Sequence, residues 1–189
     1  MSTFRPHLPA ASMMRWVIAA ATALVVLASA ASARAGYAPL DQPGPPLSVP
    51  PNLLAASLTC TPDLGISRRT AVLLVPATTV TPQEQYSWNW EPALTRLRIP
   101  WCAVKPPDHT LGDIQLSAEY VVYAIRAMHA RTGRKISIYG QSQGAVLPRW
   151  ALRFWPDLRP MVDHVISAVG SNHGTLEFNA LCEIGRAHV

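Results

Sequence analysis

The chain has 189 residues, about the length of one domain. Hydrophobic residues make up 49% and charged residues 14%, a balance that excludes an intrinsically disordered polymer. The 18 prolines exclude a coiled coil or a long helical array, and three cysteines are too few for a disulfide-dense mini-protein. We therefore expect a compact globular domain behind an apolar leader.

The leader is predicted over residues 1–35. An apolar run at 16–31 follows Arg5 and Arg15, and the small residues at 31–35 fit cleavage by signal peptidase, so the segment is typical of a secretory signal peptide. An uncleaved anchor is the weaker alternative, because the run is shorter than the roughly 20 residues that cross a bilayer. Without Arg5, Arg15 and Arg34 the net charge falls from +5 to +2, which gives no reason to expect a nucleic-acid partner.

Residues 36–56 contain six prolines, and we expect them to wrap the surface as an extended arm without a helix or an interior strand. The apolar run 71–75 ends at Pro76 and predicts a strand buried on both faces. A loop rich in Thr, Pro and Gln is expected after it.

Strands alternate with helices along the rest of the chain. Asp113 and Gly133 are suited to cap a helix at 114–132, in which apolar residues recur at helical spacing. The other predicted helices are 90–97 and 143–155, and the other predicted strands are 101–104, 136–139 and 165–169. This alternation predicts an α/β fold with βαβ units and a mostly parallel sheet with flanking helices.

The motif that carries chemistry is Gly140-Gln141-Ser142-Gln143-Gly144, which satisfies GxSxG between a predicted buried strand and a predicted helix. This is the pattern of a nucleophile elbow, in which small residues on both sides of a strained turn let neighbouring backbone pass. The hydroxyl then stands at a helix N-terminus, where backbone dipoles favour a developing oxyanion. We predict Ser142 as the nucleophile, and an ordinary Gly-Ser turn is the alternative.

An oxyanion hole needs two donors, and the backbone N–H of Gln143 is one candidate. The second usually comes from the loop after an earlier strand, where Thr78 offers both an amide and a hydroxyl. The alternative is that Thr78 and Thr79 are merely turn residues.

Several segments carry a family resemblance, in the same order and at nearly the same spacing across residues 48–175. The chain resembles the Candida antarctica lipase B-like serine lipases, which are α/β-hydrolases. The matching segments are LTC at 58–60, LLVPAT at 73–78, NW at 89–90, AEYVVYAI at 118–125, SQG at 142–144 and GT at 174–175.

This resemblance implies an α/β-hydrolase fold and a secreted serine lipase or esterase with no cofactor and no metal. It places Ser142 as the nucleophile and Thr78 with Gln143 as the oxyanion-hole pair. It also implies a disulfide between Cys60 and Cys102, which an oxidising compartment would allow. Cys182 is then left without a partner.

The chain departs from the family at several positions. Gly140 stands where the family has Thr, and Gln141 stands where it has a Trp that lines a small pocket, so the family's chiral selectivity is not expected here. Ser171 falls at the position of a pocket Asp. Pro148 lies inside the predicted nucleophile helix and is expected to kink it.

The acid and the base of a catalytic triad are not recognisable. In α/β-hydrolases the chain order is Ser, then Asp or Glu, then His. We interpret Asp157 and Asp163 as solvated charges, and His173 as a residue near the active face, with a loop residue at the pocket rim as its alternative. No match to the family's acid or base is found among Asp157, Asp163, Glu177, Glu183, His164, His173 and His188.

The last seven residues, EIGRAHV, follow Cys182 without any periodicity and match the translation of a common sequencing-library adapter. We expect residues 183–189 to be a non-native tail and residues 36–182 to be a C-terminally truncated α/β-hydrolase domain, with a genuine tail as the alternative. The fragment should then be nearly inactive, because it lacks the acid and the His.

For the full-length protein the sequence favours hydrolysis of carboxylic esters, with acylglycerols or other apolar esters as small-molecule substrates and with contact to a lipid interface. Acyl transfer or polyester cleavage through the same acyl-enzyme is one alternative. A secreted binding module without catalysis is the other.

Overall fold

A computed structural model of the protein describes residues 39–173. The predicted leader, the tail, Cys182 and the matching pair at 174–175 lie outside the described residues, as do Glu177, Glu183 and His188. Within the described range, no helix has the length and apolar character needed to span a membrane.

The observed elements follow the predicted alternation closely. The strands are β1 (Leu58–Cys60), β2 (Val72–Val75), β3 (Trp101–Val104), β4 (Ile136–Gln141) and β5 (Val162–Ala168). The α-helices are α2 (Pro51–Ala56), α3 (Pro82–Tyr86), α4 (Trp90–Arg96), α5 (Ile114–Thr132) and α6 (Gln143–Phe154), and two 3₁₀ turns are η1 (Pro107–Thr110) and η2 (Pro156–Met161).

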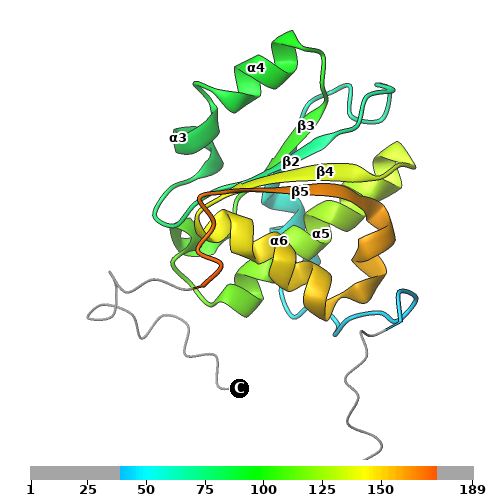
Figure 1. The fold of residues 1–189 in the computed structure, drawn as a ribbon, viewed down its shortest axis with the longest axis vertical. Coiled ribbons are helices and arrows are strands. Elements are labelled where there is room, and N and C mark those ends of the chain that lie inside the picture. Colours follow the sequence, from blue (N-terminus) through cyan, green and yellow to red (C-terminus); the bar gives the residue numbers. More distant parts are fainter. Residues whose placement is uncertain (1–38, 174–189) are drawn as a thin grey trace, which may run out of the picture. The chain divides into compact units, whose positions relative to one another are not determined.

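The five strands form one sheet in the order β1-β3-β2-β4-β5. Figure 1 labels β3, β2, β4 and β5 side by side. The pairs β2/β3, β2/β4 and β4/β5 are parallel, whereas β1 and β3 are antiparallel. The predicted mostly parallel sheet is therefore confirmed. β1 was not predicted from the sequence, because its three residues are too few to give a recognisable pattern.

Helices cover both faces of the sheet. On one face, α5 and α6 cover the sheet, and Leu73 and Val75 of β2 are buried in the core beneath them (Figure 1). On the other face, α3 and α4 cover the sheet, and Tyr86 and Leu94 pack around Leu74 in a second core. Because successive residues of a strand point to opposite faces, β2 supplies both cores in turn. This explains why its sequence is continuously apolar.

The helix predicted at 114–132 is confirmed with both of its caps. The Asp113 side chain accepts a hydrogen bond from the backbone N–H of Gln115 at 2.6 Å. Gly133 ends the helix in the left-handed conformation, with φ at 65°. The apolar face of α5 is buried against the sheet, and its residues are Ala118, Val121, Val122, Ile125 and Met128.

The predicted disulfide is also confirmed. Cys60 and Cys102 are directly paired in the register of β1 and β3, and their sulfurs are bonded. The bond closes a loop of 42 residues in sequence separation. It ties the short β1 covalently to the sheet.

Two predictions about proline-rich segments were wrong in part. Residues 39–50 have no helix or strand, as expected, but residues 51–56 form α2. Pro50 is the N-cap and Pro51 is the first helical residue. Backbone N–H groups at these positions have no intrahelical acceptor, so a proline loses no hydrogen bond there, and its fixed φ suits a helix. Prolines there start a helix rather than prevent one.

The second correction concerns the segment after Pro76, which was expected to be a loop. Residues 82–86 form α3, and Thr81 caps it. The Thr81 hydroxyl accepts from the backbone N–H of Glu84 while the Glu84 carboxylate accepts from the backbone N–H of Thr81. This capping box was present in the sequence as Thr-x-x-Glu and was overlooked.

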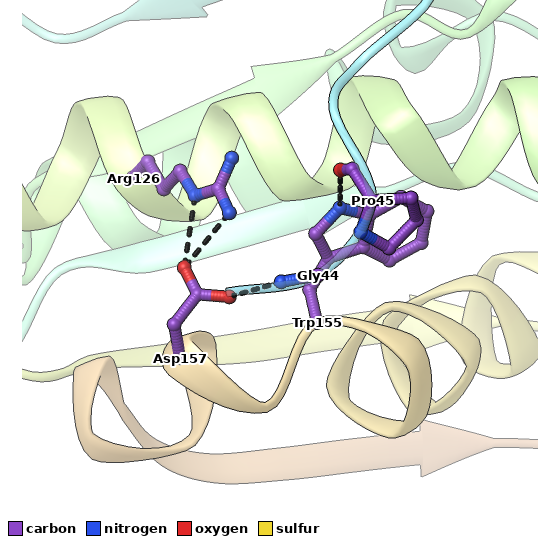
Figure 2. A network of polar contacts seen from close by, with 5 residues as sticks. All are labelled: Gly44, Pro45, Arg126, Trp155 and Asp157. Carbon is purple, nitrogen blue, oxygen red and sulfur yellow. Dashed lines mark hydrogen bonds and ion pairs between the residues drawn. The ribbon is translucent and has the colours of Figure 1, made fainter. Parts of the chain in front are cut away.

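The arm at 39–50 is held by polar contacts near its start, and Figure 2 shows them. Asp157 accepts from the backbone N–H of Gly44 at 3.3 Å and pairs with the Arg126 guanidinium at 2.8 Å. The Trp155 indole N–H donates to the carbonyl oxygen of Pro45 at 2.8 Å. The prediction that Asp157 is a solvated charge was therefore wrong, because this side chain joins α5 to the arm and is 21% exposed.

A second anchor holds the end of the arm. The buried Glu119 side chain of α5 accepts from the backbone N–H of Ser48 at 2.6 Å, from the Ser48 hydroxyl at 2.8 Å and from the backbone N–H of Val49 at 2.9 Å. Beside Glu119, Leu47 and Val49 pack against the core that contains Leu73 and Val75. The arm is thus part of the folded domain.

Candidate active site

Ser142 lies between the end of β4 and the first residue of α6. Its backbone has φ at 54° and ψ at −123°, a conformation that costs a non-glycine residue on the order of 1–3 kcal/mol. Such strain persists only where the surrounding structure imposes it, and it is concentrated at functional sites. The side chain is half-buried, and the serine stands at the N-terminus of α6.

Two glycines make this turn possible. A Cβ on Gly140 would lie 2.0 Å from the carbonyl oxygen of Gly144, and a Cβ on Gly144 would lie 2.3 Å from the carbonyl oxygen of Pro76. Both distances are far below a van der Waals contact. The start of α6 therefore packs directly against the end of β2, as expected of an elbow with small residues on both sides.

The sheet brings the loop after β2 to the same edge as Ser142. Val75 is paired with Gly140 in the parallel register of β2 and β4, so both strands end at the same level. On the other side, the backbone N–H of Ser142 donates to the carbonyl oxygen of Ala168 at the end of β5, at 3.0 Å. Ser142 thus lies at the carboxyl edge of the sheet, where α/β proteins place their ligands.

Thr78 and Gln143 are brought into contact at this edge. The Thr78 hydroxyl donates a hydrogen bond to the side-chain oxygen of Gln143. Neither the Thr78 nor the Gln143 backbone N–H donates to any residue in the range 39–173. In this arrangement the two amides, rather than the Thr78 hydroxyl, are available to an incoming oxygen atom.

Gln85 contacts both sides of the site and was not identified from the sequence. Its side-chain NH₂ donates to the side-chain oxygen of Gln141 at 2.7 Å, and its side-chain oxygen accepts from the backbone N–H of Ala77 at 2.7 Å. The side chain therefore links the residue before Ser142 to the loop that carries Thr78. Only the overlooked capping box of α3 could have indicated that Gln85 belongs to a helix facing the sheet.

Tyr86 supports the same loop from the second core. Its hydroxyl donates to the carbonyl oxygen of Val75 at 2.6 Å, and its side chain is fully buried. Burial, followed by the neighbouring Tyr139, raises the pKa of Tyr86 above its usual range. The hydroxyl consequently stays protonated and remains a donor at all ordinary pH values.

No histidine in residues 39–173 forms a hydrogen bond with Ser142. His129 contacts the carbonyl oxygen of Arg134 at 2.9 Å, and His164 pairs with Asp163 at 3.0 Å near the start of β5, away from the elbow. His173 is exposed, and Ser171 is half-buried. Among these described residues, no group of three or more His, Cys, Asp or Glu is arranged to hold a metal ion.

Comparisons with known sequences and structures find lipases that are similar to this chain. No protein-family model matches the chain. Lipase B from Pseudozyma antarctica is 35% identical to it over 133 residues, which cover 70% of this chain and 39% of that relative. The matched part of this chain is similar in sequence to that lipase B. It spans about two fifths of the length of this curated relative.

Two solved lipase structures share the fold of the described residues. Aspergillus fumigatus lipase B superimposes with a TM-score of 0.66 at 29% identity, over 70% of this chain and 32% of that one. The mature form of Bacillus licheniformis lipase BlEst2 superimposes with a TM-score of 0.53 at 16% identity, over 76% of this chain and 53% of that one. The described part of the chain therefore has the predicted α/β-hydrolase fold.

Proposed function

We propose that the full-length protein is a secreted carboxylic ester hydrolase in which Ser142 is the nucleophile. The observation that carries the proposal is the strained Ser142 at the carboxyl edge of the sheet, beside two backbone N–H groups that donate to no described residue. The homologous proteins named lipase B support the same class of reaction.

In the proposed reaction the Ser142 hydroxyl oxygen attacks the acyl carbonyl carbon and gives its proton to a general base. The Thr78 and Gln143 amides bind the resulting oxyanion, and the N-terminal dipole of α6 adds to their effect. The alkoxide then leaves as an alcohol after taking that proton, and water releases the acid from the acyl-enzyme. The base is a His oriented by an acid, as in other serine hydrolases.

No described histidine forms a hydrogen bond with Ser142, so we expect residues 39–173 alone to turn over esters very slowly. Removing the base of such a triad lowers kcat by about a million-fold, nearly as much as removing the nucleophile. The assays below therefore use the full-length protein.

We infer that the substrates are acylglycerols or other apolar esters, because the low charge of the domain suits uncharged, lipid-like molecules. The disulfide between Cys60 and Cys102 supports export, since such bonds persist in oxidising compartments. The predicted leader at residues 1–35 would direct it.

The test is hydrolysis of a chromogenic butyrate ester by Ser142→Ala and by Ser137→Ala. Ser137 lies on the same strand, β4, and serves as the matched control. We expect Ser142→Ala to lose activity by about a million-fold and Ser137→Ala to retain it. Retained activity in Ser142→Ala would refute the nucleophile assignment.

A further inference from the structure

We propose that Thr110 is a positioning residue for the oxyanion hole, because it holds the peptide group whose N–H is the Thr78 amide. This inference rests on the proposed ester hydrolysis. It concerns a residue 32 positions along the chain from Thr78, in the turn η1 that follows β3.

One hydrogen bond joins Thr110 to the loop that carries Thr78. The Thr110 hydroxyl donates to the carbonyl oxygen of Ala77 at 2.7 Å. That carbonyl and the Thr78 N–H belong to the same planar peptide unit, and the described chain has no cis peptide bond, so the two groups point in opposite directions. Fixing the Ala77 oxygen therefore fixes the direction of the Thr78 N–H.

The neighbouring backbone amides are each occupied. The Ala77 N–H donates to the Gln85 side chain, and the Thr79 N–H donates to the carbonyl oxygen of His109 at 2.7 Å. Pro76 has no N–H. In the loop 76–79, the Thr78 N–H is thus the one backbone donor with no acceptor among the described residues. The loop is clamped on both sides of the donor that the proposed reaction needs.

Thr110 is itself held in a costly conformation. Asp108, His109 and Thr110 have φ values of 50°, 52° and 60°, in the left-handed region that a β-branched residue strongly disfavours. Thr110 is nonetheless fully buried. This turn directs the Thr110 hydroxyl and the His109 carbonyl onto the same loop, so two of its three strained residues contribute a contact to residues 77–79.

The hydroxyl has an electrostatic effect as well as a geometric one. A hydrogen bond to the Ala77 carbonyl polarises the peptide group and makes its N–H a stronger donor. The effect matters most when the substrate oxygen carries negative charge, which happens in the transition state. Removing the hydroxyl should therefore lower kcat by about 10-fold and leave KM nearly unchanged.

The test compares Thr110→Val, which keeps the shape but lacks the donor, with Thr110→Ser, which keeps the donor. Thr132→Val is the matched control, because the Thr132 hydroxyl also donates to a backbone carbonyl, that of Met128 at 2.9 Å, but at the far end of α5. Activity on the chromogenic ester and thermal unfolding are measured for each full-length variant.

We expect Thr110→Val to lose about 10-fold in kcat at the same folded fraction, and Thr110→Ser and Thr132→Val to stay within about twofold of the unmodified protein. An unchanged kcat in folded Thr110→Val would overturn the inference, as would equal losses in the Val and Ser variants. If Thr110→Val does not fold, Thr110→Ala replaces it, since Ala and Ser differ by the hydroxyl alone. Failure of the proposed function is distinguishable, because the unmodified protein would then be inactive or Ser142→Ala would be active.

Discussion

Replacing Glu119 should release the arm and destabilise the whole domain. Its side chain accepts three hydrogen bonds from Ser48 and Val49, and it is 7% exposed. Glu119→Ala leaves those three donors without their acceptor and creates a cavity beneath the arm. A hydrogen bond to a charged group contributes about 1.5–3 kcal/mol, but water reaches part of the released arm, so we expect a total loss of about 4 kcal/mol.

Two milder variants should lose less stability than Glu119→Ala, because each removes fewer of these interactions. Glu119→Gln retains an oxygen that can accept both backbone N–H groups and loses mainly the charge, for about 1–2 kcal/mol. Ser48→Ala removes one of the three bonds and leaves Glu119 with two donors, for about 1 kcal/mol.

Denaturant unfolding measures all three variants. For a domain of this size, 4 kcal/mol corresponds to a fall in Tm of about 8–16 °C, which thermal unfolding would detect independently. Glu119→Ala should be the least stable and Ser48→Ala the most stable of the set. An unfolding midpoint for Glu119→Ala equal to that of the unmodified protein would refute the claim that the arm belongs to the cooperative unit.

Two further predictions concern the elbow and the disulfide. Gly144→Ala should abolish ester hydrolysis, because its Cβ would overlap the carbonyl oxygens of Val75 and Pro76. Gly133→Ala is the control: nothing lies within 4 Å of its Cβ, so it should cost only about 1 kcal/mol in denaturant unfolding and leave kcat intact. An active Gly144→Ala would contradict the packing. Reducing the disulfide should lower the free energy of unfolding by about 4 kcal/mol, since it closes a loop of 42 residues, and a midpoint that does not respond to reductant would contradict this estimate.

The features that could be predicted from the sequence have local causes or belong to a short motif of known conformation. Asp113 and Gly133 cap α5 through the preferences of their own side chains and backbone, and both were predicted. The GxSxG segment was recognised as a short motif, although the steric demand on Gly144 comes from the distant carbonyl oxygens of Val75 and Pro76. The caps of α5 depend little on distant parts of the chain.

What sequence reasoning missed depends on residues far apart. Asp157 was interpreted as solvated because its partner, Arg126, is 31 positions away. Thr110 and Ala77 are separated by 33 positions, and no periodicity marks a hydroxyl that will meet a backbone carbonyl. The errors at α2 and α3 have another origin, because there the prolines were counted without regard to their position, and Pro51 and Pro82 each begin a helix.

The disulfide between β1 and β3 affects strand exchange between two copies of this chain. A strand of three residues at the margin of a sheet would ordinarily peel away easily and could be exchanged with the same strand of another copy. Its covalent bond to Cys102 prevents that exchange, because the strand cannot leave without its neighbour.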